Sequence, residues 1–433
     1  MDDKMICFGC INDAYLVKHI KRTGVSAECS ICSKKRKAIP IDGLVSMVEN
    51  VLESYFSPGA EYLIRDDNGK ISHSEQRGDP LTLHVAELLE LDEDDPVVEY
   101  VLAKLTYCSH YEAMQGGEAK YSDEINYVLR RIQPREAEHR WEEFKLNIKH
   151  GNRFFNKDAK AFLDWLFMGV DSFKVWDGSK TVVRELVDEP IFRARRCDST
   201  AEYEAISKDT AKQLGVPPKE RAGSGRMNPS GVPAFYGAFE RKTCIAELRP
   251  PVGGRVVSGE FKLRRPVRAL DFITLDKAHE AHPISIFDPT YTEKMGRRRF
   301  LQTLHSKISI PVLPDQEHEY LVTQVIAEYL ATQYSPPIDG VLFESVQVES
   351  GTNLTLFNHA VIALDTPFIY IENLDKMVEL SPPQNVAIEY VADSLMLHSI
   401  KRVKYKTHDL SYNDNQPESA DYDEHWDDYP EWE

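Results

Sequence analysis

One stretch in the C-terminal half, residues 223–248, constrains the fold more than any other part of the sequence. It opens with a glycine- and proline-rich loop that contains Arg226, continues as an apolar run that contains Tyr236, and ends in a segment of helical composition that contains Glu247. A loop, a short strand and a helix in direct succession pack back to back across tight turns. This order predicts that the arginine, the tyrosine and the glutamate converge on one cleft.

Length and charge set the broad class of the protein. The chain has 433 residues, which is enough for two to four domains with cores of their own. Its net charge of −18 argues against a protein that coats nucleic acid along its whole surface. The sequence has no apolar run of about 18 residues and no N-terminal signal region. We therefore expect a cytoplasmic protein that makes no use of a membrane.

Four of the seven cysteines form two Cys-x-x-Cys pairs near the N-terminus. Two such pairs supply four thiolates in a tetrahedron, which is the closed geometry of structural zinc. We predict a zinc ribbon over residues 1–40 with Zn²⁺ in a structural role. The predicted ligands are Cys7, Cys10, Cys29 and Cys32.

The same N-terminal segment is basic, with eight lysine and arginine residues against four acidic ones. A basic module on an acidic protein can dock nucleic acid or a protein partner. The plainer interpretation is a solvated face on a small structural ribbon.

The remaining segments differ in their hydrophobic periodicity. Apolar residues at helical spacing from Ile41 onward predict an all-helical domain over 41–170. Short β-rich runs interleaved with helices predict an α+β domain over 171–410. Residues 411–433 are acidic, and we expect them to form a disordered tail. Within the second segment, helices are expected near 80–91, 97–108, 121–132, 136–149 and 157–168.

Several familiar catalytic motifs are missing from the sequence. It contains no phosphate-binding loop, no dinucleotide-binding glycine motif, no His-Glu-x-x-His and no Gly-x-Ser-x-Gly. These absences argue against a kinase, a dehydrogenase, a zinc protease and an α/β hydrolase.

Polar residues placed inside apolar β runs form a second set of candidates. Arginine forks suit a diphosphate or a ribose edge. A tyrosine can stack on a flat heteroaromatic ring, and a glutamate can stabilise an oxocarbenium ion. A serine hydroxyl can fix a carboxamide or the glutamate itself. Each residue also has a plain structural interpretation, such as bracing a loop or ending a strand. The set comprises Arg193, Arg226, Tyr236, Glu247 and Ser345.

Six segments, in order, resemble the RES-domain family, which is named for its arginine, glutamate and serine. This resemblance covers about residues 190–365. The matching segments are Ile191–Arg193, Gly225–Tyr236, Ile245–Glu247, Tyr320–Glu328, Asp339–Ser345 and Asn353–Phe357.

The resemblance implies an α+β fold like that of ADP-ribosyltransferases and an enzyme that degrades NAD. The reaction would be phosphorolysis or hydrolysis of the nicotinamide–ribosyl bond, with inorganic phosphate as the co-substrate of the first. The implied setting is a bacterial toxin or defence effector. By resemblance the catalytic residues would be Arg226, Glu247 and Ser345, and the NAD-binding residues Arg193, Arg195, Tyr236 and Asn353. The insertion after Arg193 leaves the choice among Arg193, Arg195 and Arg196 open.

The front half also resembles the helical HEPN-associated domain that is fused to some RES domains. Without an Arg-x4–6-His motif, this likeness implies no RNase activity. The fusion architecture and the basic ribbon suggest that the front segments sense a signal or restrain the catalytic domain. Family analogy implies a separate small antitoxin, and restraint in cis by the long front half is the alternative to it. Two alternative functions stay open: ADP-ribosyl transfer to a macromolecule, and a non-enzymatic module that only binds a nucleotide.

Overall fold

The structure of the chain is a computed structural model. It describes residues 4–65, 70–114, 120–122, 124–175, 178–280, 283–309, 319–362 and 386–404. The predicted tail over 411–433 lies outside these residues. Within them, no helix is both long and apolar enough to cross a bilayer.

The N-terminal segment folds into a small three-stranded antiparallel sheet with one helix. The strand order is β1-β3-β2, and the side chain of Asp13 caps the helix by accepting from the Leu16 N–H. Leu16 and Ile20 on the inner face of this helix are fully buried. The elements are β1 (Met5–Cys7), α1 (Ala14–Thr23), β2 (Val25–Glu28) and β3 (Lys35–Pro40).

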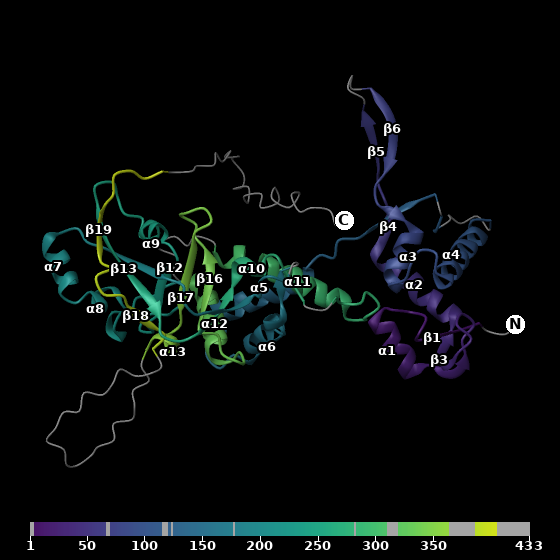
Figure 1. Cartoon of the computed structure of the whole chain (residues 1–433), viewed down its shortest axis with the longest axis horizontal. Helices are drawn as coiled ribbons and strands as arrows, with labels where there is room; N and C mark the ends of the chain where they lie inside the picture. The colour runs from purple at the N-terminus through teal and green to yellow at the C-terminus, as the bar shows by residue number, and fades with distance from the viewer. Residues whose placement is uncertain are drawn as a thin grey trace, which may run out of the picture.

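Residues 41–129 share one hydrophobic core with this N-terminal sheet. The helical periodicity that begins at Ile41 is confirmed, because α2 (Ile41–Tyr55) buries the expected face. The prediction that this region is wholly helical is wrong. Residues 126–129, expected in a helix, form strand β8 because they pair with β4 and β7. The other elements are β4 (Phe56–Pro58), β5 (Glu61–Arg65), β6 (Ile71–Gln76), β7 (Asp79–Pro80), α3 (Leu81–Leu89), α4 (Pro96–Met114) and β8 (Asn126–Leu129), and β5 and β6 form a projecting hairpin (Figure 1).

Helices α5 (Arg135–His150) and α6 (Lys157–Leu166) pack with the C-terminal half instead of with residues 41–129. The Trp141 ring lies 5.6 Å from that of Phe300, and Arg297 Nη1 donates to the carbonyls of Trp165 and Met168. The boundary predicted at residue 170 therefore falls inside one continuous core. The domain limits themselves stay predictions.

A nine-stranded sheet organises the C-terminal half, in the order β10-β14-β16-β17-β12-β11-β13-β18, with β19 also paired to β13. Among the described pairings of this sheet, only β14 and β16 run parallel. The mixture of helices with this sheet agrees with the α+β prediction. The strands are β10 (Val183–Leu186), β11 (Ile191–Arg196), β12 (Phe235–Ala238), β13 (Arg255–Leu263), β14 (Val267–Asp271), β16 (Gly340–Glu344), β17 (Thr352–Leu356), β18 (Ile388–Tyr390) and β19 (Met396–Ser399).

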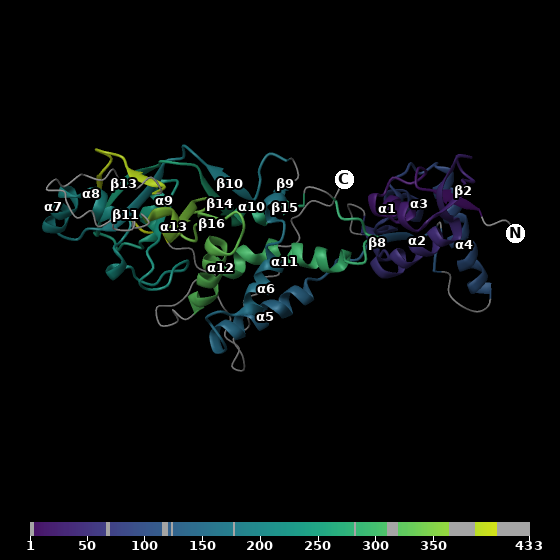
Figure 2. The ribbon, with the colours of Figure 1, turned by 90° about the horizontal axis from the view of Figure 1, so that it is seen from below.

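Both faces of this sheet are covered. Neighbouring residues such as Ala269 and Leu270 belong to different core clusters, because successive side chains of a strand point to opposite faces. Helices α5, α6, α11 and α12 lie together on one side (Figure 2). The remaining elements are α7 (Thr200–Lys208), α8 (Thr210–Leu214), α9 (Arg241–Glu247), α10 (Phe272–Leu275), α11 (Tyr291–Ser309), α12 (Tyr320–Thr332), α13 (Asn358–Val361) and the short pair β9 (Lys174–Val175) and β15 (Ala278–His279).

The start of α11 connects the two halves of the molecule. The Tyr55 hydroxyl lies 2.9 Å from that of Thr292, and its ring meets Tyr291 edge-on at 5.2 Å. Phe287, just before the helix, is buried in the core of the N-terminal half. Segment 283–292 thus contributes side chains to a core far away in sequence.

Candidate functional site

The loop that carries Arg226 is held in shape by the Tyr236 hydroxyl. This hydroxyl donates to Asn228 Oδ1 at 2.6 Å and accepts from the Met227 N–H at 3.0 Å. Asn228 Nδ2 in turn donates to three carbonyls of the same loop. From α12, Gln324 Nε2 donates to the carbonyls of Gly225 and Asn228. Burial raises the pKa of Tyr236 to about 12, so the hydroxyl keeps its proton.

The side chain of Arg226 is braced by the end of α11. Its Nη1 donates to the carbonyl of Ile308, and its guanidinium lies 5.7 Å from the centre of the Tyr320 ring. Burial lowers the pKa of Arg226, while the fields of Tyr320 and Glu247 act in the opposite direction. Arg226 therefore stands close enough to Glu247 for their charges to interact.

Arg193 lies where two neighbouring strands separate. Strands β11 and β12 pair at one position, Phe192 with Ala238, and diverge from there. The guanidinium lies 5.0 Å from the centre of the Phe235 ring, and among the residues that the structure describes its buried Nη1 has no hydrogen-bond partner. Burial lowers the pKa of Arg193 to about 10, so it still carries its charge at neutral pH. A half-buried cation with such a nitrogen is a candidate for binding an anionic ligand.

The two neighbouring arginines of β11 are engaged elsewhere. Arg195 donates to the side chain and carbonyl of Gln213 at the end of α8. Arg196 donates to the carbonyls of Leu248 and Arg249, just beyond α9. The geometry therefore favours Arg193 as the cavity residue and does not bring Arg195 to the same place.

Glu247 is fixed by two residues of the β16–β17 hairpin. The Ser345 hydroxyl donates to its Oε1 at 2.5 Å, and Asn353 Nδ2 donates to the same oxygen at 2.9 Å. Ser345 also accepts from the N–H groups of Gln347 and Val348. Ser345 and Asn353 are buried, whereas Glu247 is exposed at the last position of α9. The serine thus takes one of the roles anticipated for it, that of holding the glutamate.

Arg193, Tyr236, Glu247 and Asn353 line one cavity of about 310 Å³. Sequence reasoning missed the other side chains of its wall, Ala194, Cys244, Leu248 and Phe343, because apolar residues give no chemical signal. Burial raises the pKa of the Cys244 thiol to about 12, so it keeps its proton at neutral pH. Arg226 and Ser345 lie outside this lining, where Ser345 holds Glu247 and the loop of Arg226 is held by Tyr236.

Two supporting residues also escaped the set of site residues. Asn228 and Gln324 hold the Arg226 loop, although both occur in the motifs that carried the resemblance. The signal was present for Asn228, since Asn-Pro-Ser-Gly is a turn sequence whose amide bonds nearby backbone.

The four paired cysteines come together as predicted. Their sulfur atoms all lie within 4.8 Å of one another, and the closest pairs are 3.7–3.9 Å apart. A zinc ion with bonds of about 2.3 Å to four sulfurs requires sulfur–sulfur separations of about 3.8 Å. Cys7, Cys10, Cys29 and Cys32 therefore fit a structural zinc ion.

The cavity of this α+β unit joins a carboxylate held by two hydrogen bonds to an arginine whose buried Nη1 has no partner within the described part of the chain. Residues 190–374 match the sequence model of the RES domain, so a RES domain is present in this part of the chain. RES domains are NAD-acting, toxin-like modules, and the match supports an NAD-related function. No curated protein and no solved structure matches the chain. The resemblance of the front half to a HEPN-associated domain stays a prediction.

Proposed function

We propose that the protein cleaves NAD at the bond between nicotinamide and ribose and passes the ADP-ribosyl group to phosphate or water. The observation that carries this proposal is the cavity in which Glu247, held by Ser345 and Asn353, faces the same space as Arg193, whose Nη1 has no hydrogen-bond partner among the described residues. A negative and a positive group in one small cavity match a substrate that joins a pyridinium ribose to a pyrophosphate.

The chemistry needs stabilisation of positive charge at the ribose. The C–N glycosidic bond breaks, its electron pair leaves with neutral nicotinamide, and an oxocarbenium-like centre forms at C1 of the ribose. Glu247 lines the cavity, and among the described residues only its Oε1 receives hydrogen bonds. Its Oε2 is then available to accept from a ribose hydroxyl and to stabilise the developing charge. Attack by a phosphate oxygen gives ADP-ribose phosphate, and attack by water gives ADP-ribose and a proton.

The arginines and the tyrosine supply binding and order. Arg193 would pair with the pyrophosphate, because its buried Nη1 has no partner in the part of the chain that the structure describes. The Tyr236 hydroxyl is already engaged by the loop, so its ring face is the part that remains for the nicotinamide. Arg226 would add positive potential from behind the ring.

The test is nicotinamide release from NAD by the full-length protein and its Glu247→Ala variant, with and without phosphate. Glu185→Ala, which changes an exposed glutamate on β10, is the matched control. Release by wild type and control but not by the variant supports the proposal, and its phosphate dependence separates phosphorolysis from hydrolysis. ADP-ribose label on a macromolecule would select a transferase instead. Saturable binding of NAD without cleavage would select a binding module.

A toxin or defence role with restraint by the front half is part of the proposal. It is supported by the contact of Tyr55 with Tyr291 and Thr292, since α11 then continues to the carbonyl that holds Arg226. If the front half restrains the enzyme, Tyr55→Ala raises the rate of NAD cleavage and Tyr15→Ala, on α1, does not. Equal rates in both variants would contradict restraint through this contact.

The zinc ribbon is proposed as the place where a nucleic acid or protein partner docks. Lys21 and Arg36 flank the Phe8 ring at 4.9 and 5.6 Å, which gives a basic surface with an aromatic centre. Loss of binding to single-stranded DNA in Lys21→Glu, measured by fluorescence anisotropy, would support nucleic acid as the partner. Absence of binding by the wild type would leave the protein partner.

A further inference from the structure

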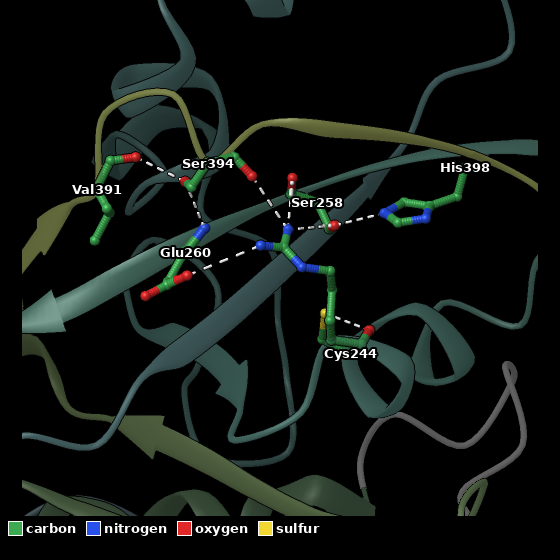
Figure 3. Close-up of polar contacts among 7 residues, drawn as sticks. Cys244, Ser258, Glu260, Val391, Ser394 and His398 are labelled. Carbon is green, nitrogen blue, oxygen red and sulfur yellow. Dashed lines mark hydrogen bonds and ion pairs between the residues drawn. The ribbon is translucent and has the colours of Figure 1, made fainter.

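Arg241, the first residue of α9, sits in a dense set of contacts outside the cavity. Its Nη1 donates to the hydroxyl and the carbonyl of Ser258 at 2.9 and 3.2 Å and to the carbonyl of Ser394 at 3.2 Å. Its guanidinium also lies 4.6 Å from the centre of the Phe192 ring. Ser258, Ser394 and His398 gather around this contact (Figure 3). The same short helix ends at Glu247. One end of α9 is thus bound to the sheet while the other end presents the carboxylate.

The partners of Arg241 include a segment that lies beyond the matched RES region, which ends at residue 374. Strands β18 and β19 pair with β13, and the turn between them is closed by Ser394. Ser394 Oγ donates to the Val391 carbonyl at 2.7 Å and accepts from the Glu260 N–H at 2.9 Å. We call residues 386–400 the C-terminal strap.

A second bond joins the strap to the same point. Ser258, which is fully buried in β13, lies with its Oγ 2.7 Å from His398 Nε2 on β19. Arg241 can only donate, so Ser258 Oγ accepts from Arg241. The same oxygen shares a hydrogen bond with His398 Nε2, and the tautomer of the imidazole decides which of the two atoms donates.

The length of α9 turns this anchor into a constraint on the cavity. A helix of seven residues spans about 10 Å and is short enough to tilt as a rigid unit. A tilt at Arg241 therefore also displaces Glu247 at the other end. Glu247 must stay within hydrogen-bond distance of Ser345 and Asn353 while it faces Arg193. Misplacement of a catalytic group by about 1 Å can cost about a hundredfold in rate.

We propose that Arg241, gripped by Ser258 and by the C-terminal strap, is a positioning residue that sets the orientation of α9 and thereby of Glu247. The strap then belongs to the catalytic unit, because it helps to fix the orientation of the helix that carries Glu247. The catalytic half of this inference rests on the proposed NAD cleavage.

The experiment compares four full-length variants: Arg241→Ala, Arg241→Lys, His398→Ala and the control Lys262→Ala. Lys262 pairs with Glu389 across the same β13–β18 junction, but both side chains are exposed. The first readout is hydrogen exchange of the α9 amides, which is independent of catalysis. The second is kcat and KM for NAD.

We expect Arg241→Ala to speed exchange across α9 at least about tenfold and to lower kcat by about tenfold to a hundredfold, with KM within about threefold of wild type. Arg241→Lys recovers part of kcat, His398→Ala shows a smaller change of the same kind, and Lys262→Ala matches wild type. Should Arg241→Ala fold poorly, His398→Ala carries the comparison.

Unchanged α9 exchange in both Arg241→Ala and His398→Ala overturns the inference. So does a loss confined to KM. A third outcome is a wild type that does not cleave NAD, combined with faster hydrogen exchange of the α9 amides in Arg241→Ala. This result would support the anchoring of α9 by Arg241 and contradict the proposed function, so the two failures are distinguishable.

Discussion

The hydroxyl of Ser345 donates to Oε1 of Glu247 at 2.5 Å, across 98 positions of the chain. The amide of Asn353 donates to the same oxygen, so one edge of the carboxylate is fully engaged by the β16–β17 hairpin. The glutamate is exposed and would otherwise have many rotamers. Two neutral donors restrict it to one orientation without cancelling its charge, which is what a group that stabilises a cationic transition state requires.

The choice among the β11 arginines is open to a direct kinetic test. Arg193→Ala removes the buried cation of the cavity, and we expect KM for NAD to rise by about tenfold to a hundredfold, since a hydrogen bond to a charged group contributes about 1.5–3 kcal/mol. Arg195→Ala removes a contact to Gln213 outside the cavity, and KM should change by less than about threefold. Similar effects in both variants would count against the assignment.

The Tyr236 hydroxyl should contribute to stability through the loop it holds. Tyr236→Phe leaves the Met227 N–H and Asn228 Oδ1 without their partner, and we expect a loss of about 1–3 kcal/mol in the free energy of unfolding. Urea titration followed by circular dichroism measures it. Tyr203→Phe is the control, because Tyr203 packs against the apolar core on the other face of the sheet. A loss no larger than that of the control would contradict this account of the loop.

Asp339, at the start of β16, should make stability depend on pH in acid. Burial favours the neutral acid, but the nearby His359 ring and hydrogen bonds from Arg265 and the Arg268 N–H outweigh it and hold the pKa of Asp339 far below its usual value of 3.8. A depressed pKa in the folded state stabilises it above about pH 4, and this contribution is lost as the pH falls further. The stability difference between wild type and Asp339→Asn should therefore shrink between pH 5 and pH 2.5.

The pH prediction is checked by denaturant unfolding at each pH. Asp188→Asn, at an exposed site before β11, serves as the control and should show no such trend. A constant difference between wild type and Asp339→Asn across this range would show that Asp339 titrates normally.

Removal of the metal should destabilise not only the zinc ribbon but also the helices that pack against it. The N-terminal sheet shares its core with α2 and α3, so loss of the cysteine cluster exposes apolar surface of both. We expect about one zinc per chain by atomic absorption, and a loss of zinc together with an earlier thermal transition in Cys10→Ser. Cys197→Ala, buried in a different core, should retain its zinc. Full zinc content in Cys10→Ser would refute the four-cysteine site.

Local sequence patterns predicted the elements that depend on near neighbours. The loop, strand and helix of 223–248 appear as β12 and α9, and the strand expected before Ser345 appears as β16. These elements follow from turn residues and apolar periodicity within a few positions of each other. The roles of the site residues stay predictions, although the structure brings Arg193, Tyr236, Glu247, Ser345 and Asn353 to one place.

Long-range packing was beyond the reach of these patterns. The periodicity of α5 and α6 shows that each helix has an apolar face. It does not show which core that face packs against, so the packing of these helices with the C-terminal half could not be predicted. Strand β8 was mistaken for helix because its four residues gain their partners from β4 and β7, far away in the sequence. No local pattern indicated a role for Arg241, because its partners Ser258 and Ser394 lie in separate segments of the sequence.

Helix α11 touches Tyr55 at its first turn and holds Arg226 by the carbonyl of Ile308 at its last. Each residue of an α-helix advances the chain by about 1.5 Å and turns it by about 100°. An insertion or deletion of a single residue between these contacts would therefore keep one of them and rotate the other away. The 19 residues of α11 therefore fix both the distance and the rotation between these two contacts. We expect α11 to tolerate substitutions on its outer surface but not a change of length.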